Sequence, residues 1–442
     1  MQYRQQTASL CPVCLQRIPA WRVGTDTDMR LEKACPEHGH FATPIWRGLP
    51  GFGEWKRDKL PSQPPVCHTQ PQAGCPFDCG LCPNHAQHTC TTLLEVTQRC
   101  NLGCPICFAR SLDSGTDPDL DTLARNMAHI RETAGPCTLQ LSGGEPTVRD
   151  DLPEIVRLAA AQNFRLVQLN TNGLRFAREP EYARALREAG LEAVFFQFDS
   201  VHDADYTTIR GRALWEEKQQ ALTAMGRAGL GVVLVPTLVP GVNTRAIGAI
   251  LRFGVQHHPV VRGVHFQPIS YFGRYPAPPA DTDRLTLPEI MRALEEQTAG
   301  LVRTQDFLPP GCEHALCSFH ATYAVAASGE LQRLGGACCS EGPIQAADGA
   351  RQTVHLTAQR WRGQQTGSTT GPETNEDDLD RFIARAREAS FTVSAMGFQD
   401  AWTVDLERLR GCCIHVHASD GRLIPFCAYN LTAANGRPLY RR

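Results

Sequence analysis

The chain has 442 residues, enough for about two to four domains, and 42% of them are apolar, enough for a hydrophobic core. Its formal net charge is −2, so no basic surface field argues for nucleic-acid binding. No signal peptide is visible in residues 1–10, and no apolar run reaches the ~18–20 residues that a membrane span needs. We therefore expect a cytoplasmic protein that has no integral membrane segment and binds no nucleic acid.

Cysteine is the unusual residue, because the chain contains 19 of them. The cysteines form local groups, and a disulfide framework is typical of short secreted chains rather than of a chain like this one. Grouped thiols in a reducing compartment indicate metal sites.

Residues 1–62 are predicted to form a rubredoxin-like or zinc-ribbon-like metal module. Cys11-Pro-Val-Cys14 is followed by Cys35 and His38, and thiolate-rich tetrahedral sites of this kind hold either iron or zinc. The fourth ligand is open between His38, which is near in sequence, and Cys67, the nearest unassigned thiol. We expect one mononuclear iron or zinc ion here.

Residues 63–92 are predicted to hold an auxiliary iron–sulfur cluster. Cys75, Cys79 and Cys82 form a Cys-x3-Cys-x2-Cys frame, and Cys90 is a candidate fourth ligand. Four thiolates would complete a [4Fe–4S] cluster suited to electron transfer. The alternative for Cys90 is a buried free thiol.

Residues 93–300 show strand–helix alternation. Apolar runs rich in β-branched or aromatic residues are predicted strands, near residues 93–97, 138–142, 165–170, 193–198, 231–237 and 263–268. Helical stretches separate most of these runs, which predicts an α/β fold with a parallel sheet, a partial (β/α)6 TIM-like barrel. The active site of such a fold lies at the C-terminal ends of its strands.

A second Cys-x3-Cys-x2-Cys frame, Cys100, Cys104 and Cys107, directly follows the first of these strands. Three thiolates can hold three irons of a [4Fe–4S] cluster and leave the fourth iron open to a small molecule. The frame at Cys75 has no strand before it, so position assigns the catalytic role to the later triad.

Polar motifs end the next three strands. Gly143-Gly144-Glu145 follows the second strand, where two glycines allow close backbone approach and a carboxylate suits a cation. Asn172 follows the third strand and is a candidate site residue or a turn former. Asp199 ends the fourth strand and could bind the ribose of a cofactor, bind the substrate, or cap the next helix.

Residues 301–442 are predicted to be a C-terminal cysteine-rich auxiliary region. Adjacent cysteines rarely bind one cluster together, so one member each of Cys338–Cys339 and Cys412–Cys413 is expected to be a spectator. A second auxiliary cluster is assigned to Cys312, Cys317, Cys338 and Cys427. The polar segment 364–378 is expected to be a loop or a disordered insertion.

Over roughly residues 93–270 these motifs resemble the radical S-adenosylmethionine (AdoMet) superfamily. The resemblance implies that the Cys100–Cys107 frame holds the cluster, and that the amino and carboxylate groups of AdoMet chelate the open iron. It also implies that Glu145 meets the AdoMet ammonium group and that Phe108 lies beside the adenine.

A wider set of motifs resembles one group within that superfamily, which contains archaeal pterin methylases and tetraether lipid synthases. The set is Cys11-x2-Cys14, Cys35-Pro-Glu-His-Gly39, Gly74-Cys-Pro-x2-Cys-Gly-Leu-Cys82, the Cys100–Cys107 frame, Gly143-Gly-Glu-Pro-Thr147 and Ile424-Pro-Phe-Cys-Ala-Tyr-Asn430. Members of the group carry extra clusters and a rubredoxin-like iron site, which implies one or two further [4Fe–4S] clusters here.

The resemblance implies a function. Ferredoxin or flavodoxin would reduce the cluster, AdoMet would be cleaved to a 5′-deoxyadenosyl radical, and a C–C bond would form at an unactivated carbon. The expected reaction is radical methylation of a pterin-like or other small molecule. The alternatives are coupling of lipid alkyl chains, which would need a long apolar tunnel, and a non-catalytic Fe–S electron carrier.

Overall fold

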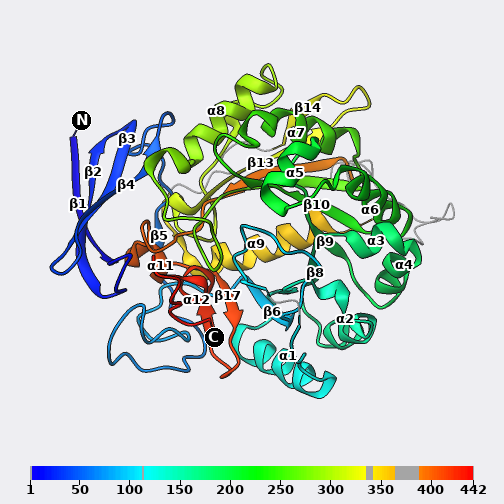
Figure 1. Cartoon of the computed structure of the whole chain (residues 1–442), viewed down its shortest axis with the longest axis horizontal. Helices are drawn as coiled ribbons and strands as arrows, with labels where there is room; N and C mark the ends of the chain where they lie inside the picture. The colour runs from blue at the N-terminus through cyan, green and yellow to red at the C-terminus, as the bar shows by residue number, and fades with distance from the viewer. Residues whose placement is uncertain (1, 112–113, 335–341, 364–387, 442) are drawn as a thin grey trace.

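A computed structural model describes residues 2–111, 114–334, 342–363 and 388–441 (Figure 1). The predicted ligand Cys338, its neighbour Cys339 and the polar segment 364–378 lie outside the described residues. Among the helices that are described, none is long and apolar enough to cross a membrane.

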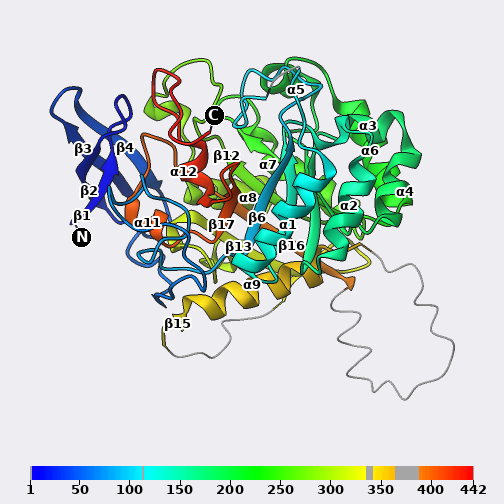
Figure 2. The same cartoon turned by 90° about the horizontal axis from the view of Figure 1, so that it is seen from below.

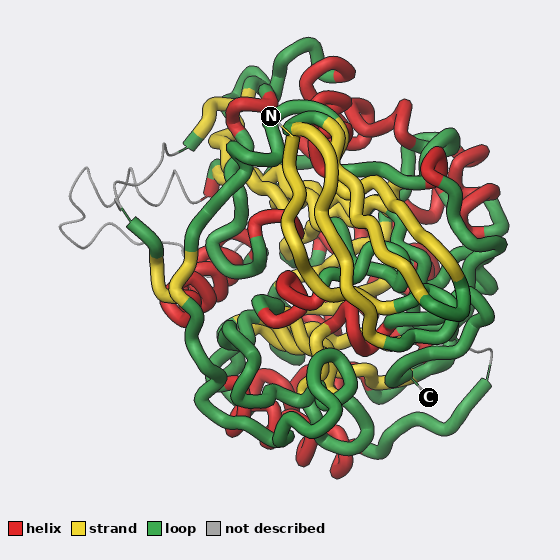
Figure 3. Tube along the Cα trace, turned by 90° about the vertical axis from the view of Figure 1, so that its left-hand side faces the viewer, coloured by secondary structure: helices red, strands yellow, loops and turns green. Residues whose placement is uncertain are grey.

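The N-terminal module is a four-stranded antiparallel sheet in the order β1-β2-β3-β4 (Figure 3). Its strands are β1 (Gln2–Leu10), β2 (Arg17–Thr25), β3 (Asp28–Cys35) and β4 (Gly39–Arg47). Residues in β2 and β3 alternate between buried and more exposed positions, as expected for a sheet with one covered face. The turn from β1 to β2 carries Cys11 and Cys14, and the turn from β3 to β4 carries His38. The predicted metal module is therefore a small β structure with both ligand-bearing turns at one end.

The core is a twelve-stranded sheet whose central strands are parallel. All six predicted strands are present: β6 (Thr91–Thr97), β7 (Thr138–Gly143), β8 (Leu166–Thr171), β9 (Ala193–Gln197), β10 (Gly231–Val235) and β12 (Val261–Pro268). They are neighbours in chain order, and Figure 1 shows them in an arc with helices outside. This confirms the predicted partial α/β barrel.

The C-terminal region extends the same sheet at both ends. Beside β12 lies the parallel strand β16 (Ser390–Met396), and beside β6 lies the parallel strand β17 (Ile414–His417). The antiparallel edge strands are β13 (Ser318–Val325), β14 (Leu331–Arg333) and β18 (Leu423–Pro425). Residues 93–300 and 301–442, which we predicted as two units, therefore share one sheet.

Two short pairings complete the strands. A two-residue strand β11 (Thr237–Leu238) pairs with the end of β12, and β5 (Lys59–Leu60) pairs with β15 (Ile344–Gln345). The β5–β15 pair ties the segment after the N-terminal module to the start of helix α9.

The helices between the strands form the outer layer. They are α1 (Leu120–Ala134), α2 (Leu152–Ala161), α3 (Leu174–Arg178), α4 (Pro180–Glu188), α5 (Asp203–Arg210), α6 (Trp215–Arg227), α7 (Ile247–Gln256) and α8 (Leu287–Gln297). In α1, Asp119 accepts from the Thr122 amide at 2.7 Å as an N-cap, and Leu123, Met127 and Ile130 form the buried stripe. Local capping and helical periodicity are therefore sufficient to define this helix.

Three helices come from the C-terminal region: α9 (Ala346–Trp361), α11 (Leu406–Arg410) and α12 (Phe426–Asn430). Helix α9 crosses the N-terminal ends of the parallel strands, below them in Figure 2. Arg262, at the start of β12, donates to the Arg360 carbonyl oxygen at 2.9 Å, and Arg165, just before β8, bonds His355 at 2.7 Å. Helix α9 thus lies at the end of the sheet opposite the Cys100–Cys107 loop.

Candidate active site

A cavity of about 480 Å³ lies within the curve of the sheet. The three thiols of Cys100, Cys104 and Cys107 and the turn Gly143–Glu145 line it at the C-terminal ends of the strands. It continues along inward-facing side chains of the strands as far as α9. The structure therefore brings the predicted catalytic motifs together at one end of a single cavity.

The cysteine loop after β6 is held by Arg274. The Cys107 amide donates to the Arg274 carbonyl oxygen at 2.9 Å, and the Arg274 amide donates back to the Cys107 carbonyl oxygen at 3.0 Å. Arg274 Nε also donates to the Cys104 carbonyl oxygen at 2.9 Å. These bonds fix the backbone of the loop while its thiols face the cavity.

The two glycines after β7 let that strand end run against the start of the cysteine loop. A Cβ atom on Gly143 would lie 2.0 Å from the Thr97 carbonyl oxygen, and one on Gly144 would lie 2.2 Å from the Arg99 carbonyl oxygen. The Gly144 amide donates to Thr97 at 2.8 Å, and the Glu145 amide donates to Arg99 at 2.8 Å. No side chain fits at either glycine without moving the backbone.

Glu145 is buried and its carboxylate is oriented by four donors. Oε1 accepts from the Thr147 amide at 3.0 Å, from its hydroxyl at 2.6 Å and from the Thr171 hydroxyl at 2.7 Å. Oε2 accepts from the Asn172 amide at 2.6 Å. Burial raises the pKa of Glu145, and the hydrogen bonds oppose that shift. Oε2 therefore accepts one of the four hydrogen bonds and Oε1 accepts three, on a carboxylate that lines the cavity.

Asn172 also lines the cavity, and its side chain is engaged on both sides. Its Nδ2 donates to Asn101 Oδ1 at 2.7 Å, and its Oδ1 accepts from the Leu174 amide at 3.0 Å. Asn172 thus connects the third strand end to the cysteine loop, and it also forms the turn that starts α3.

The contacts of Asp199 differ from those that the sequence predicted. It is fully buried, and its two oxygens accept from Arg210 at 2.7 Å each. It does not line the cavity, and α5 begins at Asp203 with His202 before it, so Asp199 is not its N-cap. Arg210 lines the cavity instead, and it opposes the burial that raises the pKa of Cys104. Sequence reasoning missed Arg210 because no motif marks it.

Phe108 is one of the few exposed large apolar side chains described, at 38% exposure. It lines the cavity next to Cys107, and its ring centre lies 5.7 Å from that of Phe426 in α12. Two aromatic faces therefore border the thiol end of the cavity, one from each of two motifs that the sequence singled out.

The thiols of Cys90, Cys312 and Cys413 form a buried group with all sulfurs within 4.8 Å of one another. We predict Cys90 with Cys75, Cys79 and Cys82, and Cys312 in a different cluster, with one member of the Cys412–Cys413 pair as a spectator. The structure groups them otherwise, because Cys90 and Cys413 each precede one of two adjacent parallel strands, β6 and β17.

Cys75, Cys79 and Cys82 remain near one another and line a small pocket. The nearby thiols of Cys75, Cys82 and Cys412, together with burial, raise the pKa of Cys79 well above its ordinary value. Cys412 is therefore a C-terminal thiol close to this frame.

Cys317 and Cys427 do not join Cys312 in the described structure, contrary to the prediction. Both lie near Cys412, whose pKa is raised well above its ordinary value, first by burial and then by Cys427 and Cys317 among other neighbours. Arg408 donates to the Cys317 sulfur at 3.4 Å, and the Gln399 amide donates to the Cys427 sulfur at 3.3 Å.

In the N-terminal module, Cys11, Cys14, Cys35 and His38 place one ligand atom each within 4.8 Å of the others. His38 Nδ1 lies 3.4 Å from the Cys35 sulfur and 3.7 Å from the Cys11 sulfur. Cys67, the alternative fourth ligand, is exposed and contacts the Pro64 carbonyl oxygen instead. Three thiols and one imidazole are a common ligand set for structural zinc.

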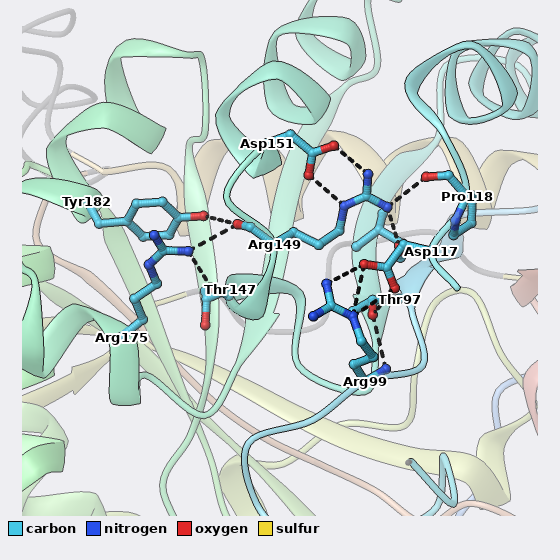
Figure 4. A network of polar contacts seen from close by, with 10 residues as sticks. Thr97, Arg99, Asp117, Pro118, Thr147, Arg149, Asp151, Arg175 and Tyr182 are labelled. Carbon is cyan, nitrogen blue, oxygen red and sulfur yellow. Dashed lines mark hydrogen bonds and ion pairs between the residues drawn. The ribbon is translucent and has the colours of Figure 1, made fainter. Parts of the chain in front are cut away.

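A polar network connects the segment at Thr97 and Arg99 with the turn at Thr147 and Arg149 (Figure 4). Asp117 accepts from the Thr97 hydroxyl and from the Arg99 guanidinium group. Arg149 donates to the carbonyl oxygens of Val96 and Pro118, at 2.8 Å each. These bonds fix β6 just before the cysteine loop.

The second half of the network holds the turn after Glu145. Arg175 donates to the carbonyl oxygens of Thr147 at 2.9 Å and of Arg149 at 3.2 Å, and its guanidinium carbon lies 3.8 Å from the Tyr182 ring centre (Figure 4). The Tyr182 hydroxyl donates to the Arg149 carbonyl oxygen at 2.7 Å. Arg175 and Tyr182 thus hold the backbone of the turn that follows Glu145.

Comparison with known proteins adds family evidence to this geometry. Residues 94–254 match the model of the Radical SAM superfamily, and residues 3–47 match that of the HMPTM N-terminal zinc ribbon domain. The fold and the site together define a radical SAM enzyme, and this superfamily uses a [4Fe–4S] cluster with AdoMet.

Among curated proteins, the chain is 33% identical over 473 residues to the 7,8-dihydro-6-hydroxymethylpterin dimethyltransferase of Methanocaldococcus jannaschii. That alignment covers 96% of this chain and 93% of the relative. Within the superfamily, the chain belongs to the family of this dimethyltransferase. It is also 29% identical to the probable GTP 3′,8-cyclase of Methanothermobacter thermautotrophicus, over 40% of this chain and 53% of that one.

Among solved structures, Streptococcus suis SuiB bound to S-adenosylmethionine aligns with a TM-score of 0.41 and 12% identity, covering 49% of this chain and 48% of that one. The anSMEcpe protein with bound AdoMet aligns with a TM-score of 0.38 and 16% identity, covering 47% and 60%. The family matches confirm the predicted superfamily, the zinc-ribbon module and the assignment as an enzyme.

Proposed function

We propose that the protein methylates a pterin-like heterocycle at an unactivated carbon. The activity named for the Methanocaldococcus relative supports this, and so does one observation on the cavity. The space in front of the three thiols continues into a lumen whose lining is largely apolar but includes the amide side chains of Gln140, Gln168 and Asn170. Such a lumen suits a flat, polar ring system.

The residues at the thiol end fit the cofactor of the superfamily. Cys100, Cys104 and Cys107 would hold three irons, and Glu145 Oε2 would receive the AdoMet ammonium group where the glycine turn allows close approach. When bound, the cluster supplies the electron that cleaves AdoMet, and the resulting 5′-deoxyadenosyl radical abstracts hydrogen from the substrate. The role of the chain is to hold both molecules in register and exclude water.

The middle of the lumen carries unpartnered hydrogen-bonding atoms. Gln168 is 1% exposed, and its Nε2 donor has no partner; the Oδ1 acceptor of Asn170, two residues along β8, has none either. Buried polar groups are normally paired, so these atoms indicate a ligand with both acceptors and donors on its edge. Such an edge is typical of a pterin and absent from an alkyl chain, which argues against lipid coupling.

An aromatic wall stands beside these amides. The Phe195 ring centre lies 5.3 Å from that of His265 and 5.5 Å from that of Trp361. All three side chains line the cavity, and aromatic faces of this kind stack well on planar heterocycles. The wall and the amides together complement the face and the edge of one ring system.

Two auxiliary clusters and a zinc ion complete the proposed cofactors. We assign one [4Fe–4S] cluster to Cys90, Cys312 and Cys413, and a second to Cys75, Cys79 and Cys82 with Cys412. We assign zinc to Cys11, Cys14, Cys35 and His38. A ferredoxin or flavodoxin is the proposed reductant, because the reaction requires single electrons at low potential.

The experiment is anaerobic reconstitution with iron and sulfide, followed by incubation with AdoMet, a reductant, 7,8-dihydro-6-hydroxymethylpterin and a cell extract as the one-carbon source. Mass spectrometry is expected to show 5′-deoxyadenosine and a pterin heavier by one or two methyl groups. Deoxyadenosine without a methylated pterin, in the presence of an added cell extract as one-carbon source, would refute the pterin assignment. Iron well above four atoms per chain would support the auxiliary clusters.

A further inference from the structure

The end of the cavity farthest from the three thiols is cationic. Arg57, Arg360 and His320 line it there, and we refer to these three residues as the arginine floor. Arg360 projects from α9, Arg57 comes from the segment after the N-terminal module, and His320 comes from β13. Three separate parts of the chain thus converge on one end of the lumen.

Neither arginine of the floor has a carboxylate partner among the described residues. Arg57 donates to the Pro309 carbonyl oxygen at 3.2 Å, a neutral acceptor, and no ion pair involves Arg360. Guanidinium groups stay charged in proteins, and a partly buried charge without a counterion is costly. The floor therefore carries two positive charges that the described protein leaves uncompensated.

The two charges act on the same neighbour. Burial first, and then Arg57 and Arg360, lower the pKa of His320 to about 4, so its imidazole is neutral at physiological pH. A neutral imidazole still offers one N–H donor. The hydroxyl of Thr353 lies near Arg57. A Cβ atom built on Gly311 would be 3.7 Å from Thr353 Oγ1 and 3.7 Å from Arg57 Nη1.

The carboxylates that line the cavity are engaged elsewhere. Glu145 is at the opposite end, where its oxygens accept four hydrogen bonds. Glu313 accepts from the Ser318 hydroxyl and lies 3.9 Å from the Cys413 sulfur. Neither carboxylate is shown bound to the floor, so an anionic ligand placed there would meet two guanidinium groups that have no carboxylate partner in the described part of the chain.

We propose that the substrate carries a phosphoryl group, which Arg57 and Arg360 bind at the floor while its ring lies between Gln168 and the aromatic wall. This inference rests on the proposed function, because it concerns the same substrate. Two guanidinium groups with an imidazole and a hydroxyl match the charge and the several acceptor oxygens of a phosphoryl dianion.

The length of the lumen agrees with such a substrate. From Gln197 at the thiol end of β9 to Ala193 at its other end there are four residue steps, or about 13 Å at the usual strand rise of about 3.3 Å. That span accommodates a two-ring heterocycle and a phosphoryl arm end to end. Anchoring the arm would also decide which ring carbon faces the thiols, so the floor acts on regiochemistry and affinity.

The first test measures binding without turnover. Calorimetry on the anaerobically reconstituted full chain would use inorganic phosphate and pyrophosphate at concentrations that leave the cluster absorbance unchanged. Pyrophosphate is expected to bind the wild type and to bind Arg360→Gln and Arg57→Gln at least about ten-fold more weakly. Arg157→Gln, which removes an exposed arginine paired with Glu154 on α2, is the matched control and should bind as the wild type does.

The second test compares two substrates, the hydroxymethyl pterin and its phosphate ester. The ester is expected to have a KM lower by about ten-fold or more in the wild type, and Arg360→Gln should erase this advantage while its iron content stays that of the wild type. Equal KM values for both compounds together with no pyrophosphate binding would overturn the inference and leave the proposed function intact. Pyrophosphate binding that depends on Arg360, without methylation of either compound, would keep the anion site and refute the pterin assignment.

Discussion

The Cys90 amide donates a hydrogen bond of 2.8 Å to the Cys413 carbonyl oxygen, and the thiols of these two residues belong to one buried group. The contact follows from sheet topology, because Thr91 opens β6, Ile414 opens β17, and the two strands pair in parallel from those residues onward. The two cysteines therefore occupy equivalent places on neighbouring strands at the end of the sheet opposite the catalytic thiols.

This relationship predicts which thiols carry the auxiliary iron. Cys413→Ala is expected to remove about one cluster, that is about four irons per chain, and to leave AdoMet binding in place. Exposed Cys67 does not belong to the group of Cys90, Cys312 and Cys413, so Cys67→Ala is the control and should keep full iron. Iron counting with electron paramagnetic resonance spectroscopy measures both, and unchanged iron in Cys413→Ala would disprove the grouping.

The catalytic triad gives a second prediction. Cys104→Ala is expected to abolish 5′-deoxyadenosine formation, because two thiolates do not hold a site-differentiated cluster stably. Cys137 is also buried but lies in the hydrophobic core, so Cys137→Ala should keep turnover and lose only stability, by about 1 kcal/mol. Chromatography of deoxyadenosine after incubation with AdoMet and dithionite separates the two. Detectable turnover in Cys104→Ala would contradict the assignment.

The glycine turn can be tested with a pair of similar substitutions. Gly144→Ala would place its Cβ 2.2 Å from the Arg99 carbonyl oxygen, whereas Gly103→Ala, inside the cysteine loop, has no atom within 4 Å of the added carbon. We expect Gly144→Ala to weaken AdoMet binding by about ten-fold or more, since relieving such a clash costs about 1–3 kcal/mol. Gly103→Ala should bind AdoMet normally. Equal AdoMet affinities by equilibrium dialysis would show that the close approach is unimportant.

Lys218 provides a prediction about pH. Its Nζ donates to the Asn172 carbonyl oxygen at 2.7 Å, and burial lowers its pKa from 10.5 to about 7. Between those values the unfolded chain holds a proton that the folded chain lacks, so raising the pH from about 7 toward 10.5 stabilises the fold, by at most about 1.4 kcal/mol per pH unit.

The Lys218→Met variant lacks this titration, so the free-energy difference between the wild type and the variant should change with pH across that window. Lys56→Met, which removes an exposed lysine, is the control and should leave the slope of the wild type unaltered. Denaturant unfolding at several pH values measures the slopes. Parallel profiles for the wild type and Lys218→Met would contradict the lowered pKa.

Local features of the sequence predicted much of this molecule. The six core strands were predictable because each is a short apolar run bounded by a helical segment, and the motif positions followed because parallel strands end at one edge. The glycine turn was predictable because Gly143 and Gly144 have a definite steric meaning.

Long-range pairings were not predictable in the same way. No sequence motif near Asp199 predicts that Arg210, at the end of α5, donates hydrogen bonds to both of its carboxylate oxygens. Cys90 follows the Cys75–Cys82 frame in sequence, yet its partners are chosen by the pairing of β6 with β17. Helix α9 closes one end of the lumen with residues from the region that we predicted only as a cysteine-rich auxiliary region.

The pairing of β6 with β17 has a consequence for biosynthesis. Because the group of Cys90, Cys312 and Cys413 needs thiols from both sides of the core, it does not exist on a nascent chain until residue 413 has left the ribosome. The same strand pairing completes the sheet beside β6, so folding of the complete core also requires the C-terminal strands. Delivery of iron and sulfur to this group must therefore follow the emergence of residue 413, and a product truncated before that residue would lack one of the three thiols.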